Sequence, residues 1–140
     1  MQLNDVDATT LKEGVEQIKA TALANGRTIR DEECDVTVAC FGQFNINRDK
    51  KQIRREVEAW YNGRVAKGYH QVQGNPSLEG LEQAGGFGPP EDVAKVLNGW
   101  YRKVKDLPAL KRLVILFASL NPMVQLERFH NEVKPLLEIR

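Results

Sequence analysis

The sequence feature that most constrains the fold is an unbroken apolar run, Leu113–Ala118, with polar residues on both sides. A strand with one face in water alternates apolar and polar residues, whereas this run is apolar at every position. Such a run is typical of a strand covered on both faces, as in a parallel sheet flanked by helices. Asn121 and Pro122 follow shortly after and are favoured at the cap and first position of a helix. We therefore predict a strand, a short turn and a helix.

A second run, Val36–Phe41, is rich in β-branched residues and predicts a second buried strand. We expect a loop over residues 42–47 and then a helix over residues 48–64. Acidic residues are interleaved with the basic ones of this helix, which favours a solvated outer face over a phosphate-binding surface. Its apolar side comprises Ile53, Val57, Trp60 and Tyr61.

A helix is also predicted near the start of the chain, from Thr9 or Thr10 to Ala24. Thr10 and Glu13 have the spacing of a capping box, and Gly26 is typical of a left-handed helix ending. The apolar face of this helix comprises Leu11, Val15, Ile18 and Ala22.

Two more helices complete the pattern. One runs from Pro90 to about Lys105, and the last begins at Pro122 and bends or ends at Pro135. The apolar stripe predicted for the last helix comprises Met123, Leu126, His130, Val133 and Leu137. The resulting order predicts an α/β fold in which a long crossover joins two parallel strands.

Composition limits the class of protein. A length of 140 residues suits one domain or subdomain, and 20 basic against 19 acidic residues give no overall field that would attract nucleic acid or an anionic membrane. No apolar segment approaches the roughly 20 residues that span a bilayer, and the first residues do not have the pattern of a signal peptide. Cys34 and Cys40 lie roughly 20 Å apart if extended, too far for a disulfide, so we expect free thiols and a cytoplasmic protein.

Residues 63–88 are rich in glycine and have no clear period, so we expect a flexible or functional segment there. Two fully buried strands would also leave unpaired backbone edges. The chain is therefore expected to be completed by a companion chain or by self-association.

Several segments in this order resemble the C-terminal part of the bacterial luciferase-like monooxygenase family. They are residues 24–27, Val36–Phe41, 47–61, 88–93, Leu113–Ala118, 121–122 and 133–137. The resemblance implies the last two strands of an eight-stranded TIM-type β/α barrel that uses FMN or a deazaflavin on small organic substrates. The first six strands of that barrel are absent from this chain.

In such barrels the active site lies at the carboxyl ends of the strands. This rule gives two groups of candidate cofactor contacts. One lies at the strand ends, and the other lies in the glycine-rich entry to the helix at Pro90, where backbone N–H groups would face a phosphate or a substrate. The candidates are Phe41, Gln43, Phe117, Ser119, Gly85, Gly86 and Gly88. The alternative is that the glycines only turn the chain and that Phe117 packs in the core.

No catalytic residue is identified, and no metal site is expected, because His70 and His130 lack further ligands at metal-binding spacing. Three hypotheses follow. In the first, the chain is part of a flavin- or deazaflavin-dependent oxidoreductase that is inactive without strands from another chain or a longer protein. In the second, it is a truncated non-catalytic relative that self-associates or binds a ligand or partner. In the third, it is a fragment without a function of its own.

Overall fold

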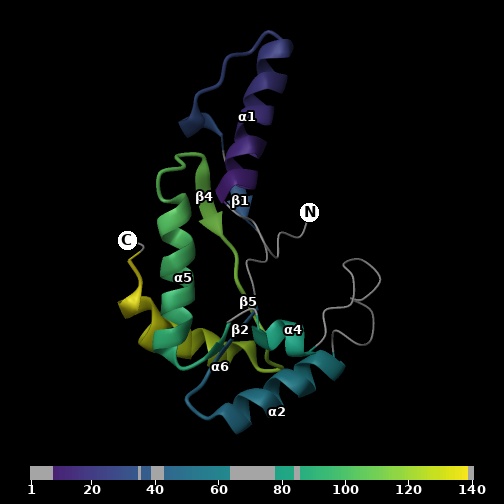
Figure 1. The fold of residues 1–140 in the computed structure, drawn as a ribbon, viewed down its shortest axis with the longest axis vertical. Helices are drawn as coiled ribbons and strands as arrows, with labels where there is room; N and C mark the ends of the chain where they lie inside the picture. The colour runs from purple at the N-terminus through teal and green to yellow at the C-terminus, as the bar shows by residue number, and fades with distance from the viewer. Residues whose placement is uncertain (1–7, 35, 39–42, 64–77, 84–85, 139–140) are drawn as a thin grey trace. The chain divides into compact units, whose positions relative to one another are not determined.

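A computed structural model describes residues 8–34, 36–38, 43–63, 78–83 and 86–138, and the chain forms two compact units (Figure 1). Unit 1 comprises Met1–Phe41 and Trp100–Val114, and unit 2 comprises Gly42–Gly99 and Ile115–Arg140. Both units contain parallel strands and helices, so the predicted α/β class is confirmed.

Unit 1 is built around two parallel strands, β1 (Val36–Val38) and β4 (Leu110–Leu113). Val38 pairs with Leu113, and the register shifts after Val36. This unit also contains helix α1 (Ala8–Ala24), the 3₁₀ turn η1 (Asp31–Glu33) and the last turn of helix α5 (Pro90–Val104).

Helix α1 ends as predicted but does not begin as predicted. Gly26 has a φ of 74°, and the Arg27 N–H donates to the carbonyl of Ala22 while the Gly26 N–H donates to that of Leu23, which is the Schellman arrangement. Thr10 lies within the helix, which already includes Ala8, so the predicted capping box at Thr10 is wrong.

Among the described residues of unit 1, the buried apolar side chains form two clusters. Leu11 packs with Val104, and Val15 packs with Cys34 and Ala109. Ile18 is 48% exposed, so only part of the predicted apolar face of α1 is buried. Cys34 is a buried free thiol, whereas Cys40 lies outside the described residues.

Unit 2 contains a three-stranded parallel sheet in the order β3-β2-β5. Its strands are β2 (Gln43–Ile46), β3 (Phe87–Gly88) and β5 (Leu116–Phe117). Along the chain, β2 is followed by α2 (Lys50–Trp60), β3 by α5, and β5 by α6 (Pro122–Arg128), while the short helix α4 (Leu78–Gln83) precedes β3. The chain continues from α6 into a π-helical turn, η3 (Phe129–Val133), and a 3₁₀ turn, η4 (Lys134–Leu136).

The apolar run Leu113–Ala118 is not one buried strand, so this prediction is wrong in its extent. Strand β4 ends at Leu113, Val114 is 41% exposed, and β5 contains only Leu116 and Phe117, both half-buried. The reason is that, among the described strands, β5 has a neighbour on one side only and so lies at the edge of its sheet. Ala118, just beyond β5, is fully buried.

The run Val36–Phe41 is confirmed as a strand only over Val36–Val38, because residues 39–41 lie outside the described residues. The loop predicted over residues 42–47 is wrong, since β2 occupies most of it. Asn45 favours a loop in isolation, but here its amide is fully buried and donates to the Glu56 carboxylate and the Ala118 carbonyl.

Helices α2 and α5 agree with the sequence pattern. Asp49 caps α2 by accepting the N–H groups of Lys51 at 2.8 Å and Gln52 at 3.3 Å. The predicted apolar side of α2 is buried, with Ile53, Val57 and Trp60 packed against Ala118. Helix α5 begins at Pro90 and buries Val93, Ala94, Leu97 and Val104.

Helix α6 begins at Pro122 as predicted, but its buried face is not the predicted one. Met123 is 61% exposed and Leu126 is 47% exposed, whereas Gln125 is fully buried. The polar Gln125 is stabilised inside by hydrogen bonds to β2 and α2, and the predicted apolar stripe therefore faces outward at these two positions. The helical segment ends in a 3₁₀ turn that contains Pro135, as expected.

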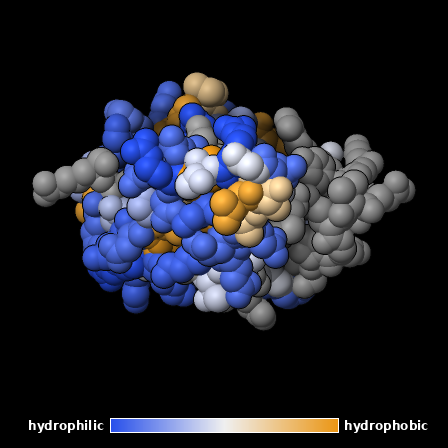
Figure 2. All heavy atoms as spheres, turned by 90° about the horizontal axis from the view of Figure 1, so that it is seen from above, coloured by the Kyte–Doolittle hydropathy of each residue, from blue (hydrophilic) through white to orange (hydrophobic). Residues whose placement is uncertain are grey.

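The described residues on the face seen in Figure 2 are mostly hydrophilic, and apolar atoms show there in small groups. Within the described ranges, no helix is both long and apolar enough to cross a membrane.

Candidate functional site

The carboxyl ends of the three parallel strands of unit 2 define the edge where a ligand site is expected. Each of β2, β3 and β5 is followed by a helix that begins near this edge. The chain passes from β2 to β3 on one side and later to β5 on the other, so the connections diverge around β2. In open α/β sheets, ligands bind outside the carboxyl ends at such a reversal of strand order.

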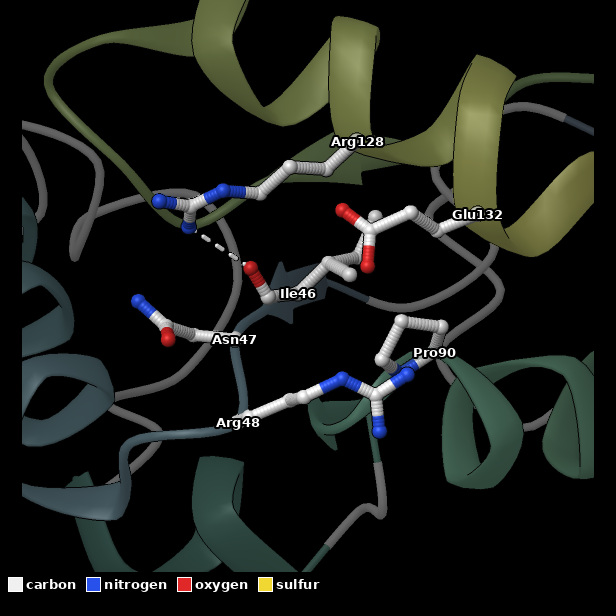
Figure 3. A pocket seen from close by; sticks show the side chains of 6 residues that line it. All are labelled: Ile46, Asn47, Arg48, Pro90, Arg128 and Glu132. Atoms are coloured by element: carbon white, nitrogen blue, oxygen red, sulfur yellow. Dashed lines mark hydrogen bonds between the residues drawn. The ribbon is translucent and has the colours of Figure 1, made fainter.

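A pocket of about 220 Å³ opens at this edge (Figure 3). Ile46 and the residues directly after β2 form one part, Pro90 at the start of α5 forms another, and side chains from α6 and η3 cover them. The six lining residues are Ile46, Asn47, Arg48, Pro90, Arg128 and Glu132.

Arg128 joins helix α6 to strand β2. Its Nη1 donates to the carbonyl oxygen of Ile46 at 2.7 Å. A guanidinium has five N–H donors, so this bond leaves most of them for other acceptors. Among the described residues no carboxylate forms an ion pair with Arg128.

Glu132 lies in the π-helical turn η3 and directs its carboxylate toward the pocket in Figure 3. Within the described part of the chain, this carboxylate has neither a hydrogen bond nor an ion pair. It nevertheless lies near enough to Arg48 that its charge helps to raise the pKa of that guanidinium.

Arg48 is held by Glu91 from the first turn of α5. The two side chains form a bidentate pair, with Nη2–Oε1 at 2.7 Å and Nη1–Oε2 at 3.1 Å. These hydrogen bonds raise the pKa of Arg48 and lower the pKa of Glu91. Since both side chains are more than half exposed, at 64% and 57%, the pair orders the pocket rim more than it stabilises the fold.

Asn47 shapes the turn between β2 and α2. Its Oδ1 accepts the N–H of Asp49 at 3.0 Å, and its own N–H donates to the carbonyl of Gly88 at 2.9 Å. The Nδ2 atom of Asn47 is buried and has no hydrogen-bond partner among the described residues.

A buried polar network beneath the pocket fixes α2 and α6 on β2. Asn45 donates to Glu56 at 3.0 Å and to the Ala118 carbonyl at 2.9 Å. Gln125 donates to the same Glu56 oxygen at 3.0 Å and accepts the Ile46 N–H at 2.7 Å. Asn45 and Gln125 are fully buried, so this network determines how the two helices lie on the strand.

Of the candidate cofactor contacts, Phe41 and Gly85 lie outside the described residues. Gln43 was expected at the carboxyl end of a strand, but it begins β2. It therefore lies at the opposite end of β2 from the pocket. Phe117 does end a strand, β5, and its ring lies 6.2 Å from that of Phe129.

The other candidates have local structural roles. The carbonyls of Gly86 and Gly88 accept the N–H groups of Asn45 and Asn47 in the β2–β3 ladder. A side chain at Gly86 would overlap the carbonyl oxygen of Gln43, which explains the glycine there. Ser119 is buried, and its Oγ accepts the Asn121 N–H at 3.1 Å. None of them lines the pocket.

The sequence patterns did not identify the pocket residues. They predict a helix with a solvated outer face that includes Arg48 and a loop that includes Asn47. The only signal in the sequence is the turn Asn47-Arg48-Asp49 directly before a helix, together with opposite charges four residues apart at Arg128 and Glu132.

The comparisons with known proteins give no match. No family model, no curated protein and no solved structure matches the chain. Over the described ranges, no group of three or more His, Cys, Asp or Glu side chains is placed to hold a metal ion.

Proposed function

We propose that this chain binds a small polar organic molecule in the pocket at the carboxyl edge of the β3-β2-β5 sheet. The observation that carries the proposal is the position of the pocket, between the ends of β2 and β3 and beneath α6. Parallel α/β sheets bind ligands at this edge because each loop from a strand to its helix contributes side chains and helix N-termini there.

The pocket favours binding over catalysis by this chain alone. Its volume of about 220 Å³ lies below the roughly 300–1,000 Å³ of sites for drug-sized ligands, so the molecule is small. The described residues that line it include two arginines and one glutamate but no Cys, Ser or His that would act as a nucleophile or proton relay.

The test is a ligand screen by thermal unfolding with a blocked variant. A ligand at 100 times its dissociation constant stabilises the folded state by about 2.7 kcal/mol, which shifts the melting temperature measurably. Glu132→Trp fills the pocket from an exposed position, and Glu127→Trp places the same ring on exposed α6 surface outside it. We expect small polar ligands to stabilise the native chain and Glu127→Trp but not Glu132→Trp. Equal shifts in both variants would contradict the proposal.

The wider assignment, part of a luciferase-like flavin- or deazaflavin-dependent oxidoreductase acting on a small organic substrate, is a second proposal. Its support is the order of the sequence motifs and the parallel pairing of the same two segments in both units, β1 with β4 and β2 with β5. By this proposal the two segments are the last two strands of a TIM-type barrel, and a companion chain or self-association completes it.

Two features limit what this chain would contribute to a flavin site. The pocket is too small for a whole flavin, and β2 lies between β3 and β5, whereas the sequential order of a barrel would place β3 between the other two. The edge strands β3 and β5 are also only two residues long each, which leaves little backbone for pairing with another chain.

Native mass spectrometry and an absorbance spectrum of the protein purified from its source test this second proposal together. A complex with a second polypeptide and a flavin or deazaflavin band supports it. A colourless homo-oligomer or monomer contradicts the oxidoreductase assignment and leaves the ligand-binding proposal standing.

A further inference from the structure

The pocket presents one positive and one negative side chain that are not paired with each other. Arg128 and Glu132 are four residues apart, a spacing at which a regular α-helix commonly forms an ion pair. Here no such pair forms between them.

The local backbone explains the separation. The helix changes from α to π at Phe129, directly after Arg128, and a π turn widens the helix and alters the spacing of side chains along it. Arg128 is also directed toward β2 by its bond to the Ile46 carbonyl. Its guanidinium and the Glu132 carboxylate therefore approach the pocket at separate places (Figure 3).

Arg48, the other charged residue in the lining, adds little to the net charge of the pocket. Arg48 is neutralised by its bidentate bond to Glu91. Among the described residues, this leaves the Arg128 guanidinium without an ion pair, the Glu132 carboxylate without a hydrogen bond or ion pair although its charge acts on Arg48, and the apolar side chains of Ile46 and Pro90.

Resting on the proposed function, we infer that the ligand is a small zwitterion of the α-amino-acid class. Its carboxylate accepts N–H groups of Arg128, and its ammonium group donates to Glu132. Such a molecule carries one group for each of the two charged side chains that line the pocket.

Ligands with a single charge complement the pocket less well. A simple anion would meet the uncompensated Glu132 carboxylate, and a simple cation would meet Arg128. In each case two like charges are brought near each other, which costs binding free energy. A zwitterion avoids both costs.

Isothermal titration calorimetry of the full chain with four probes tests this inference. The probes are glycine, acetate, methylammonium and inorganic phosphate. We expect glycine to bind most tightly and Glu132→Gln to weaken glycine on the order of 10-fold, because one charge-assisted hydrogen bond is lost. Acetate should not weaken in Glu132→Gln, since it does not use that carboxylate. Glu127→Gln, an exposed change outside the pocket, is the matched control.

The outcomes separate the inference from the function on which it rests. The zwitterion inference is overturned if acetate or phosphate binds as tightly as glycine and Glu132→Gln leaves the affinity for glycine unchanged. Ligand binding in the pocket still stands in that case, provided that Arg128→Lys weakens binding of the anion. If none of the four probes binds to the folded native chain but other small molecules do in the unfolding screen, the inference alone fails. If neither experiment detects a pocket-dependent ligand, the proposed function fails with it.

Discussion

The side-chain oxygen of Gln125 accepts the backbone N–H of Ile46 at 2.7 Å, so a helix residue occupies the place of a strand neighbour. One turn further, Arg128 donates to the carbonyl of the same Ile46 at 2.7 Å. Strand β5 pairs with β2 only as far as Phe117, and these two side chains satisfy the backbone of β2 beyond that point. The carboxyl edge of the sheet is thereby held beneath the pocket.

Gln125→Leu tests the structural weight of this contact. The substitution keeps the volume of the side chain but leaves the buried Ile46 N–H without its acceptor, so we expect a loss of about 1–3 kcal/mol in the free energy of unfolding. Urea denaturation measures it. Glu127→Ala, exposed on the same helix, should change stability by less than about 0.5 kcal/mol. A Gln125→Leu protein as stable as the native chain would show that the bond is unimportant.

Gln125→Glu should make stability depend on pH. The introduced carboxylate would lie against Glu56, to which Gln125 now donates at 3.0 Å, and the repulsion raises the pKa of the introduced group in the folded state. The folded variant then holds a proton more tightly than the unfolded chain, so its stability falls as pH rises through that raised pKa and recovers at lower pH. Relative to the native chain, we expect a larger deficit at about pH 7 than at about pH 5 in urea midpoints. A deficit that is independent of pH would argue against the Glu56 contact.

Gly86→Ala should destabilise unit 2 strongly. The new methyl group would overlap the Gln43 carbonyl oxygen, and backbone must move to admit it, so we expect a loss of at least about 2 kcal/mol. Gly99→Ala is the control, because the position lies inside helix α5 with open space around it, and a gain of roughly 0.5–1 kcal/mol is expected there. Thermal unfolding of the two variants should give shifts of opposite sign, and shifts of the same sign would contradict the β2–β3 packing.

The Arg48–Glu91 pair predicts a titration result. The guanidinium lowers the pKa of Glu91 below its ordinary value, so the pair contributes to stability above the unfolded pKa of Glu91 and loses that contribution as pH falls through the folded one. Carbon-detected NMR of the Glu91 carboxyl should show this lowered pKa, and Arg48→Gln should raise it toward the ordinary value. An unchanged titration in Arg48→Gln would show that the pair does not persist in solution.

Much of the helical structure was predictable, because a buried face needs apolar residues at helical spacing. The apolar side of α2 at Ile53, Val57 and Trp60 is an example. Helix α6 does not follow the rule that the buried face of a helix is apolar. The amide of Gln125 forms hydrogen bonds with β2 and α2 and is buried, whereas Met123 is exposed. Hydropathy patterns contain no information about such partners.

Only part of the candidate site was predictable from the sequence. The rule that ligands bind at the carboxyl ends of parallel strands points to the edge at which the pocket lies. The residues that it selected do not line this pocket, because β2 continues to Ile46, where the Asn45 Nδ2 donates to Glu56 and the Ala118 carbonyl. Arg128 also reaches the edge from a helix more than 80 positions further along the chain, and no local pattern predicts that approach.

NMR of the full chain during a glycine titration shows whether the carboxyl edge of β2 binds a small ligand. Binding at this edge predicts saturable shifts of the Arg128 Nε–H and of the backbone amides of Asn47 and Arg48. The amides of Gln43 and Leu116, at the amino ends of β2 and β5, should stay unchanged. Saturable shifts confined to other parts of the chain, with these pocket resonances unmoved, would contradict the account.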